Sequence, residues 1–110
     1  MPVRLGGLLV FGGRRAVLSR AVIPSVALLE LHQRTYDAMR GLPDLPSTTE
    51  PGRWTPHVTL ARHLDDDQLA AALGVLKGVP RELVGTIDAM RRWDADTKQT
   101  WLVSDASGTS

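Results

Sequence analysis

His57 and Thr59 stand two positions apart in GRWTPHVTLAR, in a short run of strand-forming residues that follows Pro56. Alternate side chains of an extended chain share one face, so the imidazole and the hydroxyl are predicted to project together. An imidazole can take or give a proton near neutral pH, and a hydroxyl can hold an oxygen of a reacting group. The pattern indicates acid–base chemistry. Its alternative is a purely structural histidine at the start of a strand.

Two further residues are candidates for contacts with a substrate. Trp54 lies in the loop before His57, where an indole could stack on a nucleobase. Arg20 could neutralise a phosphate if its strand face lines a cleft, and its alternative is a solvated strand residue. Arg62 has the opposite parity to His57, so a regular strand points it away from the site.

The other histidines are predicted to have no chemical role. In an extended strand His63 lies roughly 20 Å from His57, and we expect it at the surface. His32 falls beside the apolar stripe of a helix, where we expect it to be partly buried. Three scattered histidines without any cysteine match no usual metal-ligand spacing, so neither a metal nor a cofactor is expected. The run 65–67 of aspartates is expected at a helix start, where the helix dipole favours negative charge.

Composition describes an ordinary globular chain. Its 110 residues are 43% hydrophobic and carry a net charge of +1 without a dense basic run, which argues against a protein that coats nucleic acid. There is no cysteine, and no apolar stretch approaches the roughly 20 residues of a membrane span. We expect a cytoplasmic protein that does not enter a membrane, with a single lobe over residues 1–104 and a polar tail over 105–110.

The elements that must position these residues follow from periodicity and turn residues. Strands joined by a Gly-Gly turn are predicted at 3–11 and 16–23, and helices are predicted to begin at Ser25 and Asp65. A long strand at 83–93 and a last strand near 100–103 complete the pattern, with Trp93 and Trp101 as core residues. This order predicts an α+β fold: a mostly antiparallel sheet with two helices on one face.

The stretch WTPHVTLAR resembles the H-x-[TS]-x signature of the 2H phosphoesterases, which include bacterial 2′-5′ RNA ligases and 2′,3′-cyclic phosphodiesterases. The strands, the helix and the proline-rich loop that precede this signature extend the likeness over about residues 3–103. Over this range the chain resembles the second lobe of such proteins. Members of this family use two His-x-Thr signatures, one from each lobe, to divide the acid and base roles across a phosphate. The resemblance implies that His57 is one acid or base and that Thr59 is one phosphate donor.

This chain carries one signature where the family carries two, and three alternatives follow from the resemblance. Two copies form a homodimer in which each copy presents His57 to the phosphate of an RNA end or a cyclic nucleotide. Otherwise the lobe is a non-catalytic phosphate- or RNA-binding module, or an inactive half-domain. We expect the phosphodiesterase dimer, because a half-domain with an uncovered apolar face should self-associate.

Overall fold

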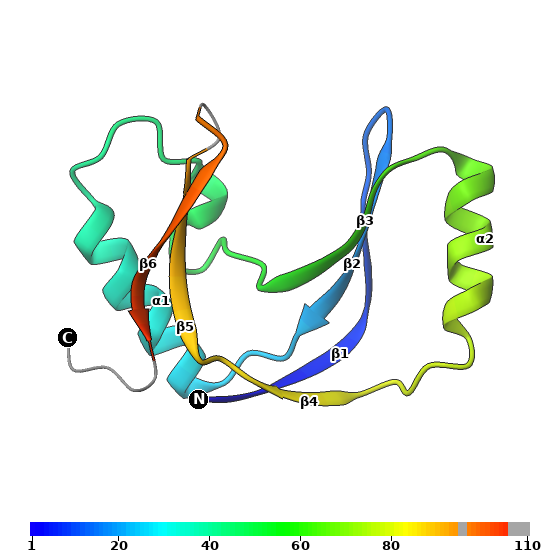
Figure 1. Ribbon diagram of the computed structural model, residues 1–110, viewed down its shortest axis with the longest axis horizontal. Helices are drawn as coiled ribbons and strands as arrows, with labels where there is room; N and C mark the ends of the chain where they lie inside the picture. Colours follow the sequence, from blue (N-terminus) through cyan, green and yellow to red (C-terminus); the bar gives the residue numbers. More distant parts are fainter. Residues whose placement is uncertain (95–96, 106–110) are drawn as a thin grey trace.

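The structure, a computed structural model, describes residues 1–94 and 97–105, and within them it contains a four-stranded sheet, a two-stranded hairpin and two α-helices (Figure 1). Both sheets are antiparallel, and the strand order of the larger one is β3-β2-β1-β4. The predicted α+β class is confirmed. In chain order the elements are β1 (Pro2–Phe11), β2 (Ala16–Val22), α1 (Val26–Met39), the 3-10 helix η1 (Ser47–Thr49), β3 (His57–Leu64), α2 (Asp66–Leu76), β4 (Leu83–Thr86), β5 (Ala89–Asp94) and β6 (Gln99–Asp105).

A pair of glycines bends the larger sheet. The register between β1 and β2 shifts between Leu5 and Leu8, so that Gly6 and Gly7 together oppose Ala21. Such a bulge bends its strand and increases the local twist. Gly6 is buried, and a Cβ built on it would lie 3.1 Å from a neighbouring side chain. A side chain at this position would therefore require Ile23 to move by a few tenths of an ångström.

Local signals start both helices where the sequence predicts. The Ser25 hydroxyl accepts a hydrogen bond from the backbone N–H of Leu28 at 3.1 Å and caps α1. Asp65 caps α2 in a capping box, because its carboxylate accepts from the N–H of Gln68 at 2.8 Å and its own N–H donates to the Gln68 side chain at 2.9 Å. Both predicted helix starts are confirmed.

The two helices occupy different places around the sheet. α2 packs on β2 and β3, on the face where Leu18 is only 1% exposed. α1 lies beside β5, where the Thr35 hydroxyl is 3.8 Å from the sulfur of Met90 (Figure 1). Neither helix is long and apolar enough to cross a lipid bilayer, a finding that covers only the described part of the chain.

The long strand predicted at 83–93 is two strands. β4 pairs with β1 as far as Pro2, and the N–H of Ile87 donates to the carbonyl of Met1 at 2.8 Å. β5 pairs with β6. The predicted core position of Trp93 is wrong, since its side chain is 60% exposed on that separate hairpin. The described residues do not include the side chain of Trp101, residues 95–96 or residues 106–110 of the predicted tail.

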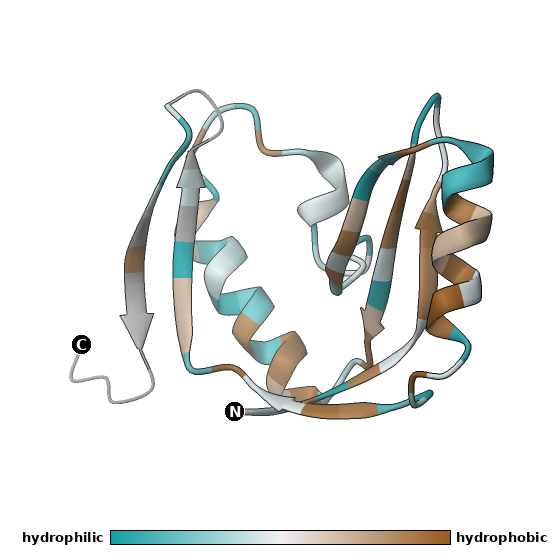
Figure 2. Cartoon of the chain, turned by 45° about the vertical axis from the view of Figure 1, so that its right-hand side comes forward, coloured by the Kyte–Doolittle hydropathy of each residue, from teal (hydrophilic) through white to brown (hydrophobic). Residues whose placement is uncertain are grey.

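The chain exposes more surface than its mass predicts. Its accessible surface is 8339 Å², whereas a folded monomer of 12.0 kDa exposes about 6000 Å². Much of α2 and β4 is hydrophobic (Figure 2), and Val84 of the edge strand β4 is 77% exposed. The β5–β6 hairpin is a sheet of two strands, which is marginally stable in water unless it packs on another element. The described fold therefore leaves apolar faces uncovered.

We predict that Asp65→Ala lowers the free energy of unfolding by about 1 kcal/mol, because the first turn of α2 loses its capping acceptor. Asp65→Asn keeps an equivalent acceptor and removes the charge, including the exposed 3.8 Å contact with Arg15. We expect it to stay within about 0.5 kcal/mol of the parent chain. Urea denaturation of the three proteins measures the difference. Equal losses in both variants would show that charge, and not capping, stabilises this helix start.

Candidate active site

Pairing with β2 decides the face on which His57 and Thr59 lie. His57 is directly opposite Ala21, and Thr59 is directly opposite Ser19. Residues two apart in this regular stretch share a face, so the imidazole and the hydroxyl lie on the same side of the sheet. His57 is exposed and Thr59 is half-buried. The structure thus brings together the two residues that the motif singles out.

The His57 ring is held by its own backbone segment. Its Nδ1 lies 2.7 Å from the carbonyl oxygen of Thr55. Because a carbonyl oxygen can only accept, Nδ1 must carry the proton, which leaves Nε2 as the nitrogen available to a reacting group. The ring also contacts Phe11, with the ring centroids 4.7 Å apart and the planes tilted by 54°. His57 is accessible to water and held in one orientation.

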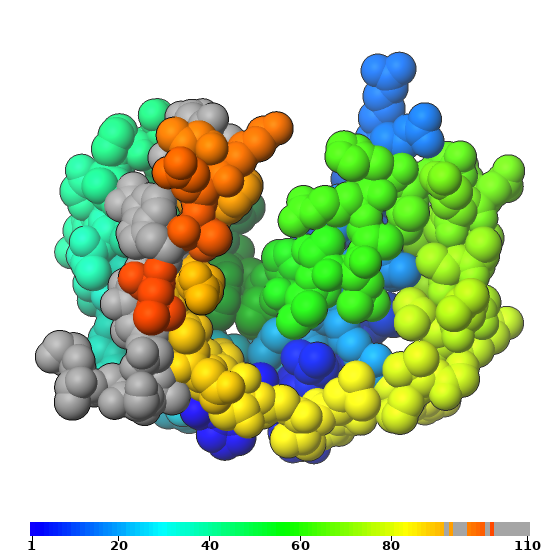
Figure 3. Space-filling model, viewed as in Figure 1, coloured from blue at the N-terminus to red at the C-terminus, as the bar shows by residue number. Residues whose placement is uncertain are grey.

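The face that carries His57 looks away from α2. In Figure 1 α2 lies on one side of the sheet and the β5–β6 hairpin on the other, and Figure 3 shows a hollow between β3 and this hairpin. Beside Thr59 on the same face is Ser19, which is fully buried and whose hydroxyl has no hydrogen-bond partner within the described residues. Leaving a buried hydroxyl unpaired costs about 1–3 kcal/mol. Sequence reasoning missed Ser19, because its position beside Thr59 appears only when the strands pair.

A bulge in β3 changes the face that Arg62 takes. Thr59 and Ala61 pair with successive residues of β2, so Leu60 is an extra residue in the strand. Ala61 consequently shares the face of Leu18, toward α2, and Arg62 returns to the face of Thr59. The prediction that Arg62 points away from the site is wrong, because it assumed regular alternation. Its exposed guanidinium group belongs to the His57 side of the sheet.

Arg20 lies on the opposite side. It pairs with Val58, one residue out of phase with Thr59, and only 6% of it is exposed. Its Nε donates to the carbonyl of Gly6 at 3.0 Å, and its Nη2 donates to the carbonyl of Pro80. The structure therefore does not bring Arg20 to His57, and the alternative of a solvated strand residue is wrong because these carbonyls hold it under the end of α2.

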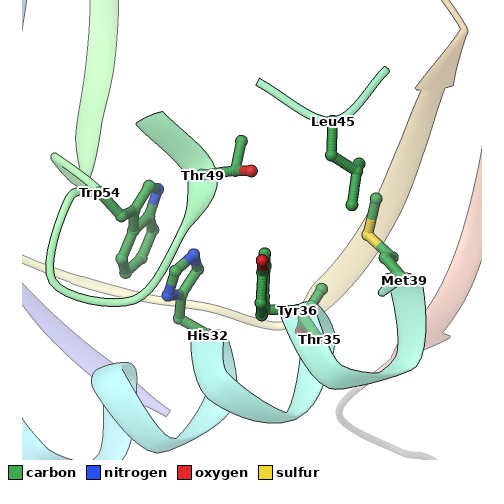
Figure 4. Close-up of a pocket in the computed structure, with 7 residues that line it drawn as sticks. All are labelled: His32, Thr35, Tyr36, Met39, Leu45, Thr49 and Trp54. Carbon is green, nitrogen blue, oxygen red and sulfur yellow. The ribbon is translucent and has the colours of Figure 1, made fainter. Parts of the chain in front are cut away.

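Trp54 lies against α1. Its indole stacks on the imidazole of His32, with centroids 3.9 Å apart and planes 7° from parallel (Figure 4). His32 is half-buried, as predicted. The stacked pair forms one wall of a cavity of about 170 Å³ between α1 and the loop that precedes β3. The other residues that line it are Thr35, Tyr36, Met39, Leu45 and Thr49.

The third histidine is remote from this chemistry. His63 is exposed, as predicted, and has a left-handed backbone with φ of 57°. It is the extra residue of a second bulge, since the register shifts again between Leu18 and Ala16 of β2. Within the described residues no three His, Cys, Asp or Glu side chains gather as a metal site would require.

A curled antiparallel sheet with an exposed His-x-Thr pair on one strand face is the architecture expected of a 2H phosphoesterase lobe. The sequence matches the profile of the 2′-5′ RNA ligase superfamily over residues 1–99. The chain belongs to this family, and thereby to the 2H phosphoesterases. Comparisons with curated proteins and with solved structures gave no match.

We predict that neutral His57 carries its proton on Nδ1, because only that nitrogen faces the Thr55 carbonyl. Two-dimensional ¹⁵N–¹H spectra of the imidazoles identify the protonated nitrogen directly. His63, which has no such partner within the described residues, is the internal reference. A His57 ring protonated on Nε2 when neutral would show that the contact with Thr55 does not orient it.

Proposed function

We propose that the chain is a phosphodiesterase of the 2H type that acts on 2′,3′-cyclic phosphate ends of RNA or on cyclic nucleotides. The observation that supports this most directly is the exposed His57 imidazole, anchored through Nδ1 and sharing a strand face with Thr59. Nε2 can exchange a proton with a reacting oxygen, and the Thr59 hydroxyl can donate to a phosphate oxygen. Arg62 adds a positive charge on the same side of the sheet.

The reaction requires two proton carriers. A water oxygen attacks phosphorus and loses its proton to one imidazole, while the bond from phosphorus to one ribose oxygen breaks. That leaving oxygen receives a proton from a second imidazole, which must start in the protonated form. The product is a phosphate monoester. His57 can take one of these roles, and in the proposed homodimer His57 of a second copy takes the other.

The surface of the chain supports such an assembly. It exceeds the surface expected of a monomer by about 2300 Å², and a third of that excess already equals the roughly 800 Å² that each partner buries in a stable interface. The hollow beside β3 is open, and Trp93 and Phe11 expose aromatic surface. A second copy facing β3 would cover this side of the sheet. With a phosphate between them, the two imidazoles would stand about 6–8 Å apart.

Trp54 is the proposed contact for the base of the substrate. It stands three residues before His57, a span of at most about 10 Å in an extended chain. A base entering the cavity at the Trp54–His32 pair would lie within one nucleotide of the phosphate at His57. Stacking on aromatic side chains is tolerant of sequence, which suits an enzyme that acts on chain ends.

The competing function is a phosphate- or RNA-binding lobe without turnover. The single signature in the chain favours it, because one imidazole cannot occupy both sides of a phosphate. Saturable binding of a cyclic nucleotide without hydrolysis, by a protein that sediments as a monomer, would establish this second function and exclude the first. An inactive half-domain would neither bind nor hydrolyse it.

We predict that His57→Ala lowers the hydrolysis rate of a 2′,3′-cyclic mononucleotide by about 10²- to 10⁴-fold, the usual contribution of a general acid or base. His63→Ala is the matched control, because it removes an exposed histidine from the same strand at a bulge remote from Thr59. Its rate should stay within about twofold of the parent rate. Equal rates for all three proteins would remove His57 from the mechanism.

We predict that mixing subunits reveals a shared site. When parent and His57→Ala chains are unfolded and refolded together in equal amounts, random pairing of a twofold dimer leaves about a quarter of the dimers with both imidazoles. Activity should then fall to about a quarter of that of the same total amount of parent chain. Activity of about one half would show that each copy works alone, and would contradict the shared site.

A further inference from the structure

A second cavity, of about 430 Å³, lies on the face of the sheet that is turned away from His57. It is lined by the glycine bulge of β1, Arg20 of β2, the end of α2 and the segment that leads to β4, and it is open to solvent. Three cationic side chains, those of Arg20, Lys77 and Arg81, line it, and among the described residues no carboxylate does. We propose that this cavity binds a phosphate group, either as inorganic phosphate or as the phosphate monoester of a nucleotide.

The buried guanidinium group of Arg20 is the centre of this site. It is only 6% exposed, yet none of the carboxylates in the described residues pairs with it, and its bonds go to the backbone carbonyls of Gly6 and Pro80. A guanidinium group has five N–H donors, and Nη1 has no partner within the described residues. Nη1 is not among the fully buried atoms, so it is accessible from the cavity, where a bound anion would give this largely buried cation a counter-ion.

The shape of the cavity suits a phosphate. Terminal guanidinium donors match phosphate oxygens, and ammonium and guanidinium groups at the rim add charge-assisted hydrogen bonds. Lys77 and Arg81 are both exposed, so they can close on a ligand from the rim. Gly7 has no atom within 4 Å of where its Cβ would stand, which leaves the β1 wall open. The volume exceeds that of one phosphate group and leaves room for an attached sugar.

This site is separate from the proposed catalytic face. Arg20 pairs with Val58, whereas His57 and Thr59 point to the other side of the sheet. The inference therefore stands whether or not the chain hydrolyses cyclic phosphates. The two hydrogen bonds of Arg20 to backbone carbonyls use only Nε and Nη2, so Nη1 is left to contact a bound phosphate.

Titration with inorganic phosphate at constant ionic strength, followed by amide NMR shifts, tests the proposal. We expect saturable shifts at Gly6 and Gly7, and we expect the double variant Lys77→Gln/Arg81→Gln to bind at least tenfold more weakly. Arg14→Gln/Arg15→Gln is the matched control, with the same charge change at the exposed β1–β2 turn. It should bind within about twofold of the parent chain. Equal weakening in both double variants, or no saturation in the parent, would overturn the proposal.

Two further experiments show where the phosphate binds and whether the site also accepts a phosphate monoester. We expect His57→Ala to bind phosphate as the parent chain does. If His57→Ala lost phosphate binding while Lys77→Gln/Arg81→Gln kept it, the anion would lie on the face of His57, and the second site would be refuted. Adenosine 5′-monophosphate that competes with inorganic phosphate, while adenosine does not, would support a site for phosphate monoesters. Competition by adenosine itself would show recognition of the base and contradict the proposal.

Discussion

The register between β2 and β3 is the constraint on which the rest of the structure depends. With Thr59 opposite Ser19, the His57 imidazole and the Thr59 hydroxyl lie on one face of the sheet, while Arg20 and Val58 lie on the other, where α2 packs. A slip of β3 by one residue would turn His57 and Thr59 to the other side of the sheet, where α2 packs, since the side-chain period of a strand is two. Chemistry and packing are therefore set by one alignment.

Bulges divide that alignment into short regular stretches. The glycine bulge in β1 bends the sheet, and its carbonyl at Gly6 accepts from the Arg20 guanidinium group. The bulge at Leu60 returns Arg62 to the side of Thr59, so a guanidinium group joins the imidazole and the hydroxyl on one face. Bulges re-aim side chains next to functional sites in many proteins, and here the extra residue adds a cation to the face of His57 and Thr59.

Local residue signals predicted much of the fold, and long-range pairing decided the rest. Ser25 and the Asp65–Gln68 pair marked helix starts because capping acts within three residues. The shared face of His57 and Thr59 followed from strand period alone. The face of Arg62 did not, because a bulge is defined by the partner strand. The burial of Arg20 depends on Pro80, which is 60 residues away, and β4 and β5 pair with different strands.

The exposed aromatic surface of Phe11 and the His57 imidazole, to which we assign the chemistry, lie on the same side of the sheet. In-line displacement at phosphorus places the attacking and leaving oxygens on opposite sides, so an imidazole fixed to one strand can serve only one of them. The contact of its Nδ1 with the Thr55 carbonyl leaves only Nε2 of His57 for a reacting oxygen. A second surface opposite β3 would bring the other proton carrier, cover Phe11 and the hydroxyl face, and exclude water, which strengthens each interaction with the phosphate charge. One facing partner thus satisfies both requirements, whereas a partner on the α2 side would satisfy neither.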